Sequence, residues 1–210
     1  MAKTDNWVLT KDKYLSTDEA NRLRKRMEAS AIVARSRGNT QAVRDWMIID
    51  LALSTGLRVM EVSALKHGDI FIRRGESELV VRCGKGGKTG RVSLGTKLKQ
   101  HLKEYIEWKQ ELGLGVGKDD YLFISQRGGK FTTRGLQLLF KQALQTAGLD
   151  TSYGFHALRH TYAVMLYKAS GWNLRLVQKE LRHSSVKTTQ VYADVSDEDA
   201  EKAVNGLWND

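Results

Sequence analysis

The chain has 210 residues and a mass of 23.7 kDa, a size that fits one domain with its own core. Its formal net charge of +10 is spread along the sequence and favours a polyanion as partner, although a basic protein without one is the alternative. A single cysteine, Cys83, excludes an internal disulfide framework and fits a reducing cytosol. The first residues lack a signal-peptide core, and the apolar runs are too short to span a bilayer. We therefore expect a cytoplasmic protein without membrane segments.

The first third of the chain predicts three helices. Residues 16–19 read Ser-Thr-Asp-Glu, a capping-box pattern that opens a helix to about Arg35. After a break at residues 38–39, apolar spacing predicts a second helix that ends at Gly56. A short helix is expected from Arg58 to Leu65.

The middle of the chain predicts a small sheet, and the remainder predicts helices. Three short apolar runs at 69–72, 78–82 and 91–94 are joined by turns and indicate an antiparallel meander. The predicted fold class is α+β, mainly α-helical, with a small three-stranded antiparallel sheet. The later helices are expected at about 96–112, 133–147, 156–170, 173–182, 186–193 and 197–208.

Residues 156–161, His-Ala-Leu-Arg-His-Thr, gather three chemically active side chains. His156, Arg159 and His160 share a helix face because they are three and four residues apart. The pair of histidines could suit zinc, but the glutamate of the HExxH pattern is missing and a guanidinium would repel the cation. Two readings stay open at this point: histidines that pack or cap, and an anion site in which the arginine binds phosphate oxygens.

Two upstream motifs are also ambiguous when taken alone. The run Gly84 to Lys88 reads Gly-Lys-Gly-Gly-Lys, and its spacing fails the P-loop pattern, so it is either a solvated hairpin tip or a basic loop that reaches a DNA backbone. Arg58 and Glu61 form either a surface ion pair or an arginine held in position by a supporting carboxylate.

Taken together, these segments resemble the catalytic domain of the tyrosine recombinases, the phage-integrase type. The resemblance rests on Thr-Gly-Leu-Arg-x-x-Glu at 55–61, the hairpin at 84–88, His-x-Leu-Arg-His-Thr at 156–161, and Leu-Arg-His-Ser-Ser at 181–185 followed by Tyr192. These motifs occur in the family's order and span nearly the whole chain. Arg182 departs from the family, where glycine is common, so the helix boundary there could differ or the arginine could add a phosphate contact.

The resemblance implies a role for each residue. Arg58 and Arg159 would clamp the scissile phosphate and stabilise its transition state. Lys85, with Lys88 as a weaker alternate, would be the general acid. Tyr192 would be the nucleophile. His156 and His183 would hydrogen-bond the phosphate and assist proton transfer, Glu61 would support the first arginine, and His160 would take the least part in the chemistry.

The implied activity is site-specific recombination of double-stranded DNA through a 3′-phosphotyrosyl intermediate, with no cofactor, metal or ATP. An inactive DNA-binding accessory of the same fold and a type IB topoisomerase are the alternatives. We expect residues 1–210 to form the catalytic domain without the family's core-binding domain. The segment from Ser196 to Asp210 is expected either to pack on its own domain or to dock on a neighbour in a homotetramer, and the protein is expected to be nucleoid-associated.

Overall fold

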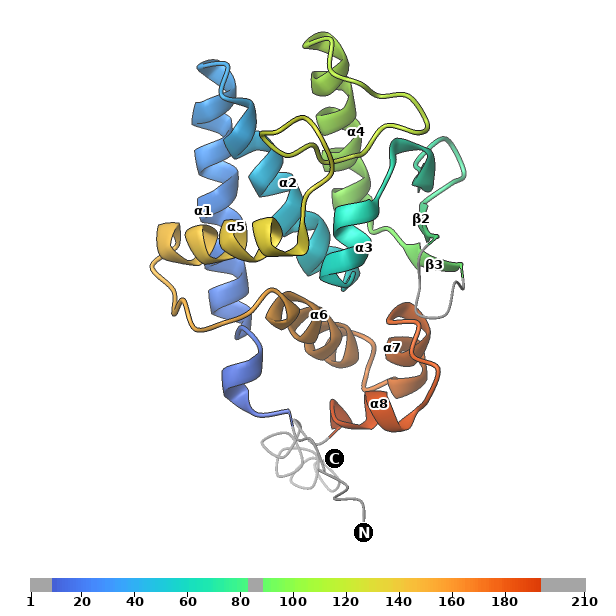
Figure 1. Cartoon of the computed structure of the whole chain (residues 1–210). Coiled ribbons are helices and arrows are strands. Elements are labelled where there is room, and N and C mark those ends of the chain that lie inside the picture. Colours follow the sequence, from blue (N-terminus) through green and yellow to red (C-terminus); the bar gives the residue numbers. More distant parts are fainter. Residues whose placement is uncertain (1–8, 83–88, 194–210) are drawn as a thin grey trace, which may run out of the picture.

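Helices make up most of the structure, and one small sheet lies at their side (Figure 1). The structure is a computed structural model, which describes residues 9–82 and 89–193. Its helices are η1 (Lys11–Lys13), α1 (Thr17–Ser36), α2 (Thr40–Thr55), α3 (Val59–Ala64), η2 (His67–Asp69), α4 (Thr96–Glu111), α5 (Thr133–Thr146), α6 (His156–Ala169), α7 (Leu174–Glu180) and α8 (Lys187–Gln190). Its strands are β1 (Ile70–Phe71), β2 (Glu78–Val81) and β3 (Gly90–Ser93).

The predicted fold class is confirmed, and the local signals act as expected. At the start of α1 the Ser16 hydroxyl accepts a hydrogen bond from the Glu19 backbone N–H, and the Glu19 carboxylate accepts one from the Ser16 backbone at 2.8 Å. At the end of α2, Gly56 adopts a left-handed conformation with φ of 60°. The helix expected at 186–193 is shorter: α8 ends at Gln190 and is followed by turn residues at Val191 and Tyr192. The helix expected at 197–208 lies outside the described residues.

Helix α2 is the centre of the main core. It packs against α1, α4 and α6, and its last three turns are buried almost all round. One charged residue, Asp50, is buried within it. Its carboxylate accepts a hydrogen bond from Arg24 Nε at 2.8 Å, and its other oxygen lies 2.9 Å from His101 Nδ1. These partners tie α1 and α4 to α2, because a buried charge must be paired.

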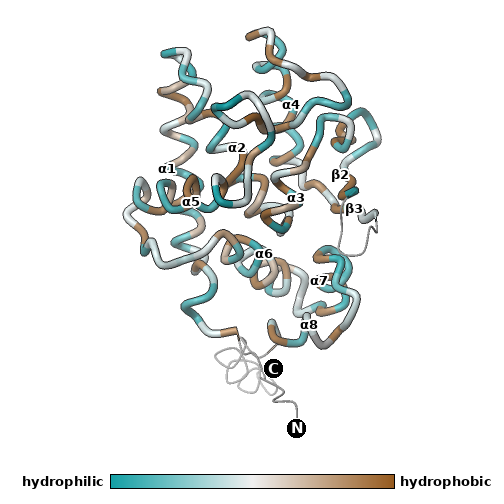
Figure 2. The backbone as a smooth tube through the Cα atoms, in the orientation of Figure 1, coloured by the Kyte–Doolittle hydropathy of each residue, from teal (hydrophilic) through white to brown (hydrophobic). Residues whose placement is uncertain are grey.

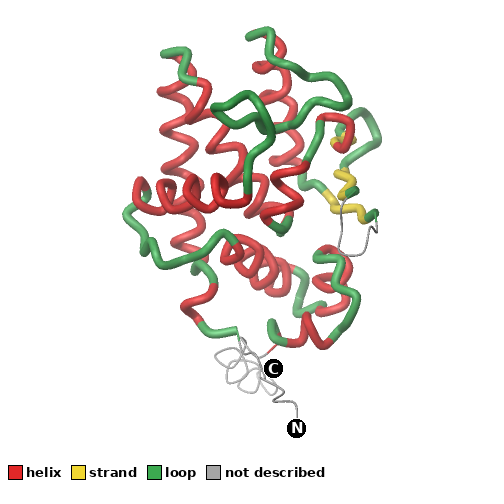
Figure 3. The backbone as a smooth tube through the Cα atoms, viewed as in Figure 1, coloured by secondary structure: helices red, strands yellow, loops and turns green. Residues whose placement is uncertain are grey.

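The sheet lies beside the carboxyl end of α7. Its order is β1-β2-β3 and both pairings are antiparallel, with Leu79 opposite Val92 at the centre of the second pair. Figure 3 shows the strands confined to one side of the helical body. Glu180 at the end of α7 accepts hydrogen bonds from the Ser93 backbone at 3.1 Å and the Ser93 hydroxyl at 3.0 Å. The sheet is thereby held to the C-terminal helices.

A second, smaller apolar cluster lies between α6, α7 and the turn after α8. Figure 2 shows polar and apolar positions alternating along α1, the pattern of a helix with one face on the main core. Helix α6 differs, because Leu158 packs in the main core whereas Val164 packs in the second cluster. Helix α6 therefore joins the two clusters.

Among the described residues, no helix has the length and apolar character required to cross a bilayer.

Candidate active site

Gly56 sets the geometry of the first arginine. Its φ of 60° is accessible to glycine, and an added Cβ would overlap the ring of Tyr162, so the chain can pass this point only without a side chain. The sharp exit from α2 places Arg58 at the N-cap of α3. The Gly56 carbonyl also accepts a hydrogen bond from Arg159 Nη1, which connects this turn to α6.

Glu61 is a buried carboxylate shared by two guanidiniums. It accepts hydrogen bonds from the Arg58 backbone N–H at 2.7 Å, from Arg58 Nη1 at 3.0 Å and from Arg182 Nη2 at 2.7 Å. Its side chain is only 3% exposed, whereas that of Arg58 is 34% exposed. The pair is therefore a surface-reaching arginine on a buried support, and the reading of a simple surface ion pair is wrong.

Arg159 on α6 is almost completely buried. Its Nη2 donates to the Leu181 carbonyl at 2.8 Å and to His183 Nε2 at 2.9 Å. Burial, with a smaller contribution from nearby Arg58, lowers the pKa of Arg159 to about 10. The guanidinium therefore stays charged at neutral pH and is fixed between α2 and the end of α7.

Arg182 and His183 follow α7 in a left-handed turn. Arg182 has a φ of 55°, which is uncommon for a residue with a side chain and which glycine adopts readily. An arginine can only donate, so His183 Nε2 accepts from Arg159, and Nδ1 then carries the proton toward Thr189 Oγ1 at 2.9 Å. Burial and then Arg159 lower the pKa of His183 to about 4, which keeps it neutral.

Tyr192 lies in the second apolar cluster with its hydroxyl next to α6. Tyr192 is 2% exposed, and its Oη lies 3.0 Å from His160 Nδ1. Burial raises the pKa of Tyr192 to about 12, and the positive charges of Arg159 and Arg58 oppose this rise. The phenol is therefore protonated at neutral pH.

The structure brings most of the sequence-predicted residues together. Arg58, Arg159, His183 and Tyr192 come from four separate segments, and the two arginines act electrostatically on both His183 and Tyr192. His156 at the start of α6 joins them, and burial and then Arg159 lower its pKa. Lys85 and Lys88 lie outside the described residues. Within the described ranges, no three His, Cys, Asp or Glu side chains could together hold a metal ion.

Sequence reasoning missed two contacts. It set aside His160, which proves to be the partner of the Tyr192 hydroxyl. It left open what Arg182 contacts, and the structure shows the carboxylate of Glu61. For His160 the sequence held one indication of this contact. His160 lies one helical turn before Ala163 and Val164, the apolar residues of α6 that share a buried cluster with Tyr192.

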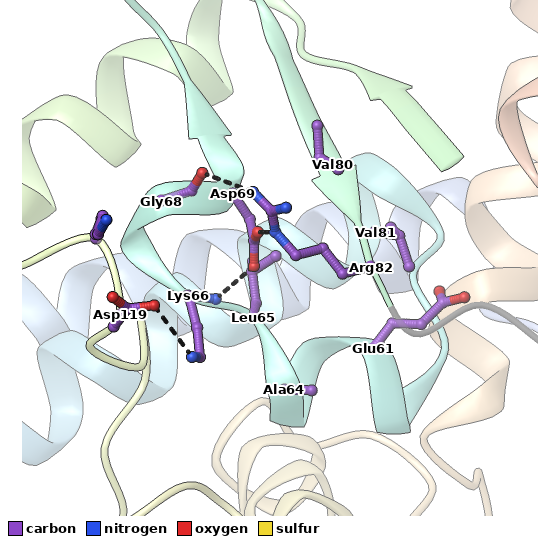
Figure 4. A pocket seen from close by; sticks show the side chains of 11 residues that line it. Glu61, Ala64, Leu65, Lys66, Gly68, Asp69, Val80, Val81, Arg82 and Asp119 are labelled. Carbon is purple, nitrogen blue, oxygen red and sulfur yellow. Dashed lines mark hydrogen bonds and ion pairs between the residues drawn. The ribbon is translucent and has the colours of Figure 1, made fainter. Parts of the chain in front are cut away.

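A pocket of about 490 Å³ opens between α3, η2 and β2, with Glu61 at one wall (Figure 4). Arg82 at its rim pairs with Asp69 through Nε and reaches the Gly68 carbonyl from Nη2 at 3.5 Å. Arg82 is the last described residue before the segment 83–88. These contacts anchor the end of β2 to η2, so the chain enters the predicted hairpin from a fixed point next to the site.

Comparison with known proteins defines the class. The sequence model of the phage integrase family matches residues 13–199. The chain is 36% identical over 157 residues to the tyrosine recombinase XerD of Oceanobacillus iheyensis, covering 74% of this chain and 51% of that protein. It is 35% identical over 161 residues to the tyrosine recombinase XerC of Roseiflexus castenholzii, covering 75% of this chain and 49% of that protein. The chain thus spans about half the length of these curated relatives.

Solved structures agree with the sequence comparison. The crystal structure of XerA recombinase superposes with a TM-score of 0.73 at 29% identity, over 94% of this chain and 66% of that one. The XerH recombinase, in a post-cleavage complex with a palindromic difH substrate, gives a TM-score of 0.73 at 26% identity, over 94% of this chain and 54% of that one. The fold is that of a tyrosine recombinase catalytic domain. This chain belongs to the phage integrase family.

Proposed function

We propose that this chain cuts and rejoins double-stranded DNA at specific sites through a 3′-phosphotyrosyl intermediate, without metal or ATP. The observation that carries the proposal is the convergence of Arg58, Arg159 and His183 around one buried carboxylate, with the Tyr192 phenol close enough for both arginines to act on its pKa. Such a site has excess positive charge and a nucleophile, which is what phosphoryl transfer requires.

The two arginines would bind the non-bridging oxygens of the scissile phosphate. Arg159 is fixed by two backbone carbonyls, and Arg58 is held by Glu61, so neither needs to reorganise when charge develops on the pentacoordinate phosphorus. In the observed state His183 accepts from Arg159 through Nε2 and so orients that guanidinium; the hydrogen bond from His183 to the phosphate, which the resemblance implies, would require Nε2 to carry a proton once DNA is bound. His156 would do so from the first turn of α6.

The reaction would then exchange one phosphate ester for another. The Tyr192 oxygen attacks phosphorus, the bond from phosphorus to the 5′ oxygen breaks, and Lys85 protonates the leaving oxygen. The new ester keeps the energy of the phosphodiester, so the free 5′ hydroxyl of another strand can reverse the step without ATP. The role of Lys85 rests on the family resemblance alone.

Charge and kinship support DNA as the partner. The net charge of +10 suits a phosphate backbone, and the XerH recombinase was solved on its DNA substrate. We propose that residues 1–210 act as the catalytic domain and that the active assembly is a homotetramer on recombining DNA. Its contacts would involve Ser196 to Asp210, a segment outside the described residues. Such an enzyme would work in the cytoplasm at the nucleoid.

Covalent capture tests this function. The protein is incubated with a pool of duplexes that have randomised sequence and a nick, so that cleavage near the nick releases a short strand and traps the enzyme. We expect a covalent adduct on a denaturing gel, enriched for one sequence, and no adduct with Tyr192→Phe. DNA binding without any adduct would favour the inactive accessory, and relaxation of supercoiled plasmids that lack the recovered sequence would favour the topoisomerase.

A further inference from the structure

The hydrogen bond between His160 and Tyr192 has no place in the roles that the resemblance assigns. It joins His160 Nδ1 to the phenolic oxygen at 3.0 Å, across 32 residues of sequence. Both residues are buried, at 8% and 2% exposure. Water therefore has little access to this hydroxyl, and His160 is the basic group placed at the atom that must lose a proton.

Helix α6 fixes the position of the His160 ring. His156, one turn earlier, meets it edge to face with ring centroids 4.6 Å apart. Tyr192 is fixed from the other side by the cluster that includes Ala163, Val177 and Leu181. Neither ring can turn away from the other without breaking this packing.

The other two histidines of the site are less suited to this proton transfer. His183 uses Nε2 to accept from Arg159 and directs Nδ1 to Thr189. His156 approaches His160 through its ring, and no hydrogen bond of His156 to the phenol is observed. Among the described histidines, the geometry selects His160.

The charges around His160 keep its lone pair available. Burial, and then the positive groups that face it, lower its pKa to about 3, so it is neutral at physiological pH. The groups that face it are His156 and Arg159 on α6, Lys13 on η1, His183 after α7, and Tyr192 after α8. A bound phosphate adds negative charge against Arg159 and Arg58, which raises the proton affinity of the imidazole when DNA is present.

We propose that His160 is the catalytic base that accepts the proton of Tyr192. This inference rests on the proposed function. As the O–H bond of Tyr192 breaks, a bond forms between that proton and Nδ1 of His160, whose Nε2 carries the other ring proton. The tyrosine oxygen bonds to phosphorus, the bond to the 5′ oxygen breaks, and that oxygen takes its proton from the general acid. On rejoining, His160 returns the proton to Tyr192.

The test compares His160→Asn with the wild type on the nicked duplex recovered by covalent capture. Asparagine places an amide oxygen near the position of Nδ1, so it can accept a hydrogen bond but cannot take the proton. We expect the single-turnover rate of adduct formation to fall at least about 100-fold, the lower range for a lost general base. The matched control is His67→Asn, which replaces another buried histidine away from the site and should leave the rate within about threefold.

A substrate with sulfur in place of the leaving 5′ oxygen separates base from acid. Sulfur leaves as a thiolate without a proton, so this substrate restores variants that lack the acid and does not restore those that lack the base. His160→Asn should remain slow on it. Its rate should also rise about tenfold per pH unit from pH 7 to 9, because hydroxide must replace the base, whereas the wild-type rate should stay nearly flat.

The outcomes are distinct. An absent adduct in the wild type overturns the proposed function and this inference with it. If the wild type forms the adduct and His160→Asn reacts at the same rate or faster, this inference alone is overturned. That result is expected if the hydrogen bond only held the Tyr192 side chain in its buried position. Recovery by the sulfur substrate also overturns it. Thermal unfolding and DNA-binding measurements on the same preparation separate a chemical defect from misfolding, and His160→Gln, which lacks a base at any position, must show the same pH slope.

Discussion

Removing the charge of Glu61 is expected to destabilise the protein far more than an ordinary ion-pair mutation. In Glu61→Gln, an amide with its own N–H donors replaces the carboxylate that accepts from Arg58 and Arg182. Breaking a buried ion pair from one side costs about 3–5 kcal/mol. Because the Arg58 side chain is 34% exposed, water recovers part of this cost, and we expect a loss of about 3 kcal/mol.

The magnitude can be measured by thermal unfolding. For a domain of this size, about 3 kcal/mol corresponds to a fall in Tm of roughly 6–12 °C. The matched control is Glu78→Gln, which removes the same charge from the exposed pair between Glu78 and Arg91, whose side chains are 32% and 72% exposed. That change should cost less than about 1 kcal/mol. A Tm for Glu61→Gln within 2 °C of the wild type, or no lower than that of Glu78→Gln, would refute the reasoning.

Three further changes test other parts of the structure. Arg182→Gly removes the contact with Glu61 but also relieves the strain of a left-handed backbone at position 182. We therefore expect less than half the fall in Tm of Glu61→Gln, and DNA cleavage about tenfold slower than in the wild type. A fall in Tm equal to that of Glu61→Gln would contradict this reasoning. His67 has a pKa lowered to about 4 by burial and Lys109, so the folded state resists its protonation, and stability should fall by up to about 1.4 kcal/mol per unit as pH drops from 6.5 toward 4. Urea midpoints across that range should show a smaller slope in His67→Asn, and an unchanged slope would count against it. Deletion from Ser196 onward should weaken tetramer formation on DNA in sedimentation experiments more than single-site binding, and unchanged assembly would argue that the segment packs on its own domain.

Local sequence patterns predicted the secondary structure well because each depends on neighbouring residues. The capping box at Ser16 placed the start of α1, and the break at Gly56 placed the end of α2, each within a residue of its observed position. The three-stranded meander followed from short apolar runs separated by turns. These features need no knowledge of distant contacts.

The site was predictable only in part. Motif order proposed Arg58, Arg159, His183 and Tyr192 as site residues, and the structure brings these four residues into one region. The partners that hold them were not predictable, because Glu61 meets Arg182 across 121 residues and His160 meets Tyr192 across 32. Such pairs arise from the packing of α3, α6 and α7. The sequence pattern of one segment does not indicate which side chains of a distant segment it will contact.

The second partner of Glu61 has a consequence for how this sequence can vary. The Arg182 side chain crosses Gly90 at the start of β3 so closely that any Cβ there would overlap its Cδ. A side chain at 90 would therefore force the Arg182 side chain to shift from its contact with Glu61, whereas glycine at 182 would remove this obstacle. We therefore expect the two positions to vary together: a relative with glycine at 182 could diversify at 90, whereas random mutagenesis of this chain should recover side chains at 90 more often alongside a second change at 182.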